Sequence, residues 1–137
     1  LVELAGGKKP QGSARVLAER ATAQATLSEN VARLRAARAY MFEAVDIAWE
    51  KARATGEVAL AERAGLRNAA THAARTALAV TREMYELGGG SSVFLSSPLQ
   101  RRMRDASVGA QHMMVAPQTN ELTGRYFMGL PTDASFL

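Results

Sequence analysis

The chain has 137 residues, no cysteine and a net charge of +4, so it is long enough for one domain with a core and is only mildly basic. The lack of cysteine excludes disulfides, thiolate metal sites and cysteine nucleophiles. No apolar run reaches the ~20 residues that cross a bilayer, and Leu1 does not begin a signal peptide, so we expect a cytoplasmic protein with no membrane partner. Arginines interleaved with glutamates are typical of a solvated helix surface and do not indicate nucleic-acid binding.

Apolar residues at intervals of three and four predict two long helices. Residues 1–13 are predicted to be the end of a truncated helix followed by a linker rich in glycine and proline. The first long helix is expected from Ala14 or Ala21 to Ala54, and its apolar face comprises Leu27, Val31, Leu34, Met41, Val45, Ala48 and Ala52. The second is expected from Glu57 to Leu87, and its face comprises Leu66, Ala70, Ala73, Ala77, Val80, Met84 and Leu87.

A loop rich in glycine and serine, residues 88–97, separates the second helix from a third. The third helix is expected to start at Pro98, because proline suits the first turn of a helix. It would present Leu99, Met103, Ala106, Ala110 and Met113, and Pro117 would kink or break it. Residues 14–131 then form one helical domain, and residues 132–137 form a tail.

These elements predict an all-α fold, an antiparallel helical bundle, since signals for β-strands are nearly absent. The helix faces are rich in alanine, which lets helices approach closely but makes a thin core. We therefore expect a large apolar area to be buried against something outside this chain. Together with the apolar segment at residues 1–5, this indicates a fragment of a larger protein.

The segment 89–112 resembles the C-terminal helical domain of the acyl-CoA dehydrogenase superfamily, and the resemblance covers nearly the whole chain. Five residues match the family pattern Gly-Gly-x-Gly, Pro and Arg-Asp: Gly89, Gly90, Pro98, Arg104 and Asp105. Ser92 replaces the third glycine of that pattern. Members of the superfamily are much longer and add an N-terminal helical domain and a β-domain, so the resemblance implies that this fragment alone is inactive.

Two departures from the dehydrogenase pattern favour another branch of the superfamily. The resemblance assigns the dehydrogenase base to a glutamate whose position is Ser96 here, and a serine hydroxyl needs a partner to take its proton. After Arg-Asp, dehydrogenases continue into a Glu-Gly-Thr segment, whereas this chain has Gln111-His112-Met113-Met114. A histidine there resembles the flavin-dependent monooxygenases that use a separate flavin reductase. In those enzymes it lies near the flavin, where it can hydrogen-bond activated oxygen or take a proton from a phenol or indole.

The resemblance therefore implies hydroxylation of a small aromatic or heteroaromatic substrate by O₂, with reduced FMN or FAD supplied by a flavin reductase. It assigns the catalytic role to His112 and places Ser96 and Met113 at the substrate pocket. It assigns flavin contacts to the loop residues Gly88, Gly89, Gly90, Ser91 and Ser92. In the superfamily this loop often reaches the flavin of a neighbouring subunit, which implies a homotetramer. The Arg-x-x-Phe-Gly motif that binds pyrophosphate is not recognisable, so FMN remains open beside FAD.

Two alternative functions remain open, an acyl-CoA dehydrogenase whose base lies outside this fragment and a non-catalytic helical interaction module.

Simpler interpretations also exist for single residues: His112 could be an ordinary helix histidine, and the glycines could be a helix cap. His72 has no acidic neighbour at helical spacing, so we expect a structural role and no metal site. Arg104 and Asp105 are expected to form a buried structural ion pair. The methionines are expected to lie in the core or, as a second interpretation, to line a substrate pocket: Met103, Met113, Met114 and Met128.

Overall fold

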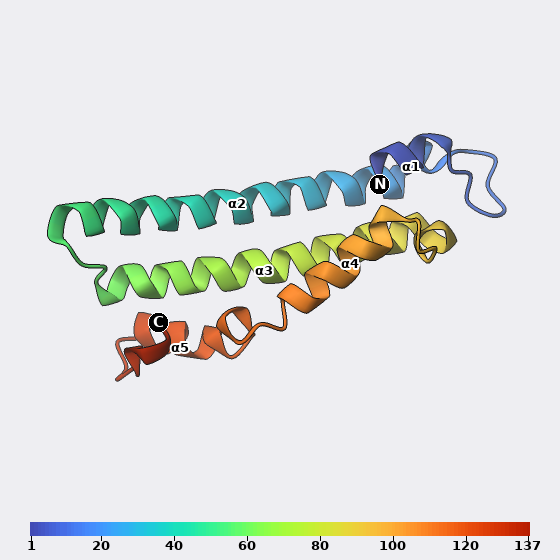
Figure 1. Cartoon of the computed structure of the whole chain (residues 1–137). Coiled ribbons are helices and arrows are strands. Elements are labelled where there is room, and N and C mark those ends of the chain that lie inside the picture. The colour runs from blue at the N-terminus through green and yellow to red at the C-terminus, as the bar shows by residue number, and fades with distance from the viewer.

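The computed structural model describes residues 1–137 and contains helices and no strands, which confirms the all-α prediction (Figure 1). The α-helices are α1 (Val2–Gly7), α2 (Ala21–Thr55), α3 (Leu60–Gly88), α4 (Pro98–Gly109) and α5 (Thr119–Phe127). The 3₁₀ turns between and after them are η1 (Leu17–Glu19), η2 (Gly89–Ser92), η3 (Met113–Val115) and η4 (Ala134–Phe136). Figure 1 shows α2 and α3 as an antiparallel pair, with α4 and α5 following α3 on its side away from α2.

Small side chains bring α2 and α3 together. The most buried residues of α2 recur every seven positions, namely Ala23, Asn30, Ala37 and Ala44, and Ala48 joins them. Seven residues are about two turns, so these positions lie on one side of the helix. The predicted face was partly wrong, because Val31, Leu34 and Val45 are exposed while only Ala48 of that set is fully buried. Close helix approach selects alanine for the contact line, and the larger apolar residues lie beside it.

The central helix is α3, which contacts α2, α4 and α5. Because neighbours surround it, its fully buried residues are spread around the helix rather than along one face: Ala64, Ala69, Thr71, Thr76, Val80 and Gly88. Of the predicted face, Val80 is buried and the other six residues are half-buried. Gly56 ends α2 with a positive φ of 80°, as the sequence predicts, and Pro98 begins α4.

The third predicted helix is shorter than expected. It ends at Gly109, and His112 and Met113 lie outside it, His112 as the N-cap of η3 and Met113 as the first residue of η3. Glycine is a poor helix former, and the His112 side chain accepts a hydrogen bond from the Met114 amide, a local bond that competes with helix continuation. Pro117 stands in the next turn, just before α5.

The core is thin, since only 16 of 137 residues are buried and ten of those are hydrophobic, mostly alanines. One line of exposed apolar side chains runs along α2 beside its contact with α3; we call it the α2 stripe, formed by Val31, Leu34, Phe42, Val45 and Trp49. Arg38 lies within it and holds its guanidinium 4.4 Å from the centre of the Phe42 ring. None of the helices combines the length and apolar character needed to span a membrane.

One polar network crosses the α2–α3 contact. Asn30 Nδ2 donates to one carboxylate oxygen of Glu83 at 2.6 Å, and Arg33 Nη1 donates to the other at 2.7 Å. These two hydrogen bonds, the one from Asn30 first, hold the pKa of Glu83 below its ordinary value. The charged form of Glu83 therefore stabilises the fold.

The Glu83 network predicts an acid-sensitive contribution to stability. Since the pKa is lowered on folding, the contribution is fully present above the ordinary glutamate pKa of about 4.3 and is lost as the pH falls through the lowered folded-state pKa. We expect Glu83→Gln to flatten the acid limb of a plot of unfolding midpoint against pH below about pH 5. The matched control is Glu86→Gln on the same helix, where the side chain makes only an exposed pair with Arg82. Equal acid limbs in Glu83→Gln and the parent would contradict this account.

Candidate functional site

The glycines of the loop after α3 are required for different reasons. A Cβ on Gly88 would lie 2.1 Å from Ser92 Oγ and 2.7 Å from Leu99 Cδ1, so this position has no room for a side chain. Gly89 has a φ of 53° with an extended ψ of −147°, a conformation that suits glycine. Around Gly90 there is open space. Gly88 and Ser92 are buried, so an external ligand would meet Gly89, Gly90 and the half-buried Ser91.

Overpacking at Gly88 should be destabilising. We expect Gly88→Ala to lower the free energy of unfolding by about 1–3 kcal/mol, because the added methyl group must displace Ser92 or Leu99. Gly90→Ala is the matched control, with nothing within 4 Å of the new Cβ and an expected change within about 0.5 kcal/mol. Chemical denaturation of the two variants measures the difference, and equal stabilities would show that the close contact at Gly88 is not a constraint.

Lys8 holds this loop from the other end of the sequence. Its Nζ donates to the carbonyl of Gly88 and, at 2.7 Å, to Ser91 Oγ. The Leu17 amide in turn donates to the Lys8 carbonyl at 2.8 Å, which fixes the segment that carries the lysine. Sequence reasoning missed Lys8, because the contact joins positions 80 residues apart and no periodic pattern marks it.

A cavity of about 380 Å³ opens beside the loop. Two cations, Lys8 and Arg20, border it together with Gly89 and Gly90, which carry no side chains. Glu86 also borders the cavity, but its carboxylate pairs with Arg82 at 3.0 Å. Cationic donors beside exposed glycine backbone suit an anion such as a phosphate, so the residues present fit the phosphate end of a flavin.

His112 is exposed and caps η3. Its Nδ1 accepts a hydrogen bond from the Met114 amide at 3.2 Å. A nitrogen that accepts carries no proton, so the neutral imidazole holds its proton on Nε2 and offers an Nε2–H donor to the surroundings. His112 is therefore not an ordinary histidine in the middle of a helix, because its backbone and ring are set by the turn.

Two arginines of α3 tie the C-terminal segments to the bundle. Arg67 Nη1 donates to the Met114 carbonyl at 2.8 Å, and its Nε donates to the Phe136 carbonyl at 2.9 Å. Arg63 binds only the tail, through the carbonyls of Ala134 at 2.6 Å and Leu137 at 3.1 Å. Neither arginine was singled out from the sequence, since both look like ordinary positions of a charged helix surface.

The structure does not bring all the predicted site residues together. Ser96 is exposed in the turn before α4, and His112 follows the end of α4. With 12 residues, α4 is ~18 Å long at 1.5 Å per residue, so the glycine loop and His112 lie at opposite ends of this helix (Figure 1). Met113, which is 63% exposed, follows His112 directly, after the C-terminal end of α4.

Two interpretations of other residues were wrong. Arg104 and Asp105 are exposed and make no ion pair, because both lie on the outer side of α4. The four methionines do not form one core cluster, because Met113 and Met128 are largely exposed whereas Met103 and Met114 are half-buried.

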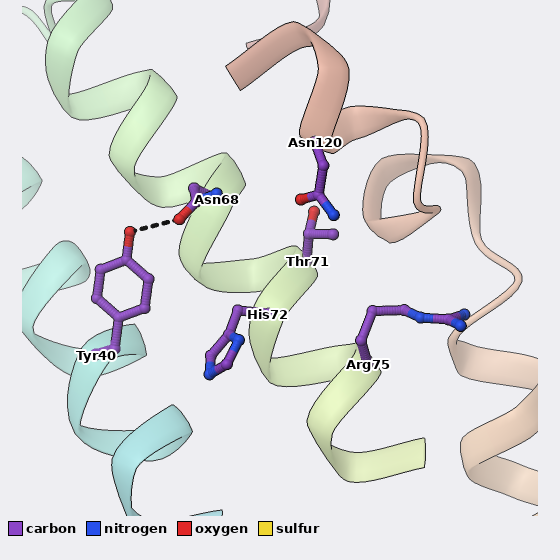
Figure 2. Close-up of a pocket in the computed structure, with 6 residues that line it drawn as sticks. All are labelled: Tyr40, Asn68, Thr71, His72, Arg75 and Asn120. Carbon is purple, nitrogen blue, oxygen red and sulfur yellow. Dashed lines mark hydrogen bonds between the residues drawn. The ribbon is translucent and has the colours of Figure 1, made fainter. Parts of the chain in front are cut away.

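A second, polar cavity of about 270 Å³ lies between α2, α3 and α5 and is bordered by His72 (Figure 2). Two hydrogen bonds use polar groups of its wall: Tyr40 Oη donates to Asn68 Oδ1 at 2.8 Å, and the hydroxyl of Thr71 is 2.6 Å from that of Thr119. Figure 2 shows His72 and Arg75 leaving α3 in different directions, so they do not converge on one ligand. No three histidine, aspartate or glutamate side chains gather in a metal-binding arrangement.

Comparison with known proteins agrees with the fold. The family described as "Acyl-CoA dehydrogenase, C-terminal domain" matches residues 1–117. The chain belongs to this family. Three curated relatives are also similar to this chain, and two of them are named indole-3-acetate monooxygenase.

The relative from Pseudomonas putida is 36% identical over 126 residues, which cover 92% of this chain and 32% of the relative. The relative from Acinetobacter baumannii is 29% identical over 135 residues, 98% of this chain and 35% of the relative. A pigment production hydroxylase from Rhodococcus erythropolis is 33% identical over 93 residues, 68% of this chain and 24% of the relative. The chain thus spans about a third of the length of the first two relatives.

Proposed function

We propose that this chain is the C-terminal domain of a flavin-dependent monooxygenase. The full-length protein would hydroxylate a small aromatic or heteroaromatic substrate, with O₂ and with reduced FMN or FAD from a separate reductase. The observation that carries the proposal is His112, exposed with a free Nε2–H, in a stretch (residues 87–120) whose one carboxylate is Asp105.

The same stretch argues against a dehydrogenase. Removal of a proton next to a thioester carbonyl needs a positioned base, most often a carboxylate. Asp105 is exposed in the middle of α4, away from both the glycine loop and His112. An acyl-CoA dehydrogenase would therefore need its base outside this stretch, whereas a monooxygenase finds its proton donor or acceptor within it. Relatives named as monooxygenases and a hydroxylase support the second possibility and favour an indole or a similar ring as substrate.

The proposed site would have two parts, one that binds the flavin phosphate and one that contacts the reacting oxygen and the substrate. Reduced flavin, when bound, would supply two electrons, so that one atom of O₂ enters the substrate as hydroxyl and the other leaves as water. Lys8, Arg20 and the backbone of Gly89 and Gly90 would hold the flavin phosphate. The Nε2–H of His112 would donate a hydrogen bond to the reacting oxygen, and Met113 beside it would contact the apolar ring of the substrate.

A homotetramer would account for the separation of these two parts. The glycine loop and His112 lie at opposite ends of α4, so each could serve a flavin held by a different copy of the protein. The α2 stripe leaves the large side chains Phe42 and Trp49 52% and 65% exposed, which is typical of a surface that another chain covers. We propose that copies of the full-length protein associate through this stripe.

A turnover assay tests the proposed function. The full-length protein would be mixed with FMN or FAD, a flavin reductase and its reductant NADH, O₂ and a panel of phenols and indoles that includes indole-3-acetate. Oxygen-dependent formation of a hydroxylated product is the expected result, and the 137-residue chain alone should give none. Absence of product, together with bleaching of bound oxidised flavin by an acyl-CoA, would favour the dehydrogenase. Absence of any flavin binding would leave the interaction module.

A further inference from the structure

Met114 is held at both of its backbone polar groups, which belong to two successive peptide units. Its N–H donates to His112 Nδ1 at 3.2 Å, and its C=O accepts from Arg67 Nη1 at 2.8 Å. The Arg67 bond is the one hydrogen bond between residues 110–118 and α3. The imidazole is thus linked to α3 through one residue of η3, Met114.

We infer that Arg67 is a positioning residue for His112. By holding the Met114 carbonyl, it restrains the η3 turn, which is closed by the bond from the Val115 N–H to the His112 carbonyl at 2.9 Å. The restrained turn keeps the Met114 N–H directed at His112 Nδ1, and this N–H keeps Nδ1 free of a proton. The ring is thereby held as the Nε2–H tautomer with that donor facing outward. The inference rests on the proposed function, in which the His112 Nε2–H meets the reacting oxygen.

The chemistry of arginine suits this task. A planar guanidinium offers several N–H donors in a fixed fork, and Arg67 uses two of them on two backbone carbonyls, those of Met114 and Phe136. Hydrogen bonds from a charged donor are stronger than neutral ones, so the carbonyl of a short turn can be held firmly. Groups that orient a functional histidine in this way commonly change its activity when they are removed.

A structural role for Arg67 predicts different behaviour. Arg63 lies one turn earlier on α3 and also binds carbonyls of the tail, at Ala134 and Leu137, but it makes no bond to η3. If tethering of the tail were all that mattered, loss of either arginine would have similar consequences. Arg63→Gln is therefore the matched control for Arg67→Gln.

A double-mutant cycle in the full-length protein tests the inference. The variants are Arg67→Gln, His112→Ala and the two combined, and the measured quantity is the fraction of consumed O₂ that appears as hydroxylated product. We expect Arg67→Gln to lower this fraction about tenfold in the parent and to have no further effect once His112 is alanine. Arg63→Gln should leave the fraction within about twofold of the parent. Equal losses caused by Arg67→Gln with and without His112 would overturn the inference.

The outcomes separate the inference from the proposed function. An unchanged product fraction in His112→Ala would overturn the proposed role of His112 itself, and the inference with it.

The tautomer of His112 gives a second readout that does not depend on a variant that folds. Nitrogen-15 NMR of labelled histidine in the parent should show neutral His112 protonated on Nε2 and not on Nδ1. In Arg67→Gln we expect a mixture of the two tautomers. A parent that holds Nδ1–H would overturn the inference whatever the activity of the variants.

Discussion

Replacement of His112 by alanine in the full-length protein is expected to lower formation of hydroxylated product about 100-fold, the usual scale for loss of a proton donor or acceptor at a reacting group. Reduced flavin should still consume O₂, so the missing product should appear as hydrogen peroxide. Flavin affinity should change little, because the phosphate contacts are proposed at Lys8, Arg20 and the glycine loop, at the other end of α4. Chromatography of the product and a peroxide assay measure both quantities.

Two matched variants separate the chemistry of the imidazole from its capping bond. Asparagine at position 112 can still accept from the Met114 amide but cannot donate in the manner of Nε2–H, so His112→Asn should be stable and nearly as inactive as the alanine variant. Gln111→Ala changes the exposed neighbour and should retain activity. Full activity in His112→Asn would show that position 112 serves the fold alone.

Loss of the two aromatic residues of the α2 stripe is expected to break up the oligomer. Phe42 and Trp49 are 52% and 65% exposed in this chain, so replacing both with serine removes little internal packing. At a subunit interface, by contrast, a large aromatic side chain commonly contributes about 2 kcal/mol or more. We therefore expect Phe42→Ser with Trp49→Ser to weaken subunit association at least about 100-fold, while the helical content is retained. Light scattering over a range of protein concentrations measures the change.

The control for the α2 stripe lies on the same helix. Ile47 is 55% exposed, but two positions beyond Val45 correspond to about 200° around the helix, so it faces another direction. Ile47→Ser should leave the oligomer intact. A tetramer that survives loss of Phe42 and Trp49, or one that dissociates equally with Ile47→Ser, would argue against the stripe as the interface.

Local signals in the sequence predicted most of the fold. Period-3.6 patterns indicated α2 and α3, and their ends were marked by Gly56 and the glycines from Gly88 onward. Pro98 marked the start of α4. The buried side of α2 was predicted only in part, because a hydrophobic pattern favours Val31 and Leu34 over alanine. Which side faces α3 is decided by how closely two backbones approach, and this depends on the partner helix.

The family could be predicted from the sequence, whereas the geometry around the proposed site could not. The pattern from Gly89 to His112 indicated the family, and the match over residues 1–117 confirms it. That His112 lies beyond the end of α4 depends on Gly109 and on the Arg67–Met114 contact, which joins positions 47 residues apart. The contact between Lys8 and the glycine loop spans 80 residues. Such pairings arise only when the chain is folded, and no spacing along the sequence encodes them.

The isotopic origin of the product oxygen tests the central claim most directly. The full-length protein would be supplied with reduced flavin and an indole or phenol substrate under ¹⁸O₂, and the product would be analysed by mass spectrometry. The account predicts one ¹⁸O atom in the new hydroxyl group of each product molecule, with a yield that falls when His112 is alanine. Contrary results would be a product free of ¹⁸O, or no product at all in a protein whose bound oxidised flavin is reduced by an acyl-CoA.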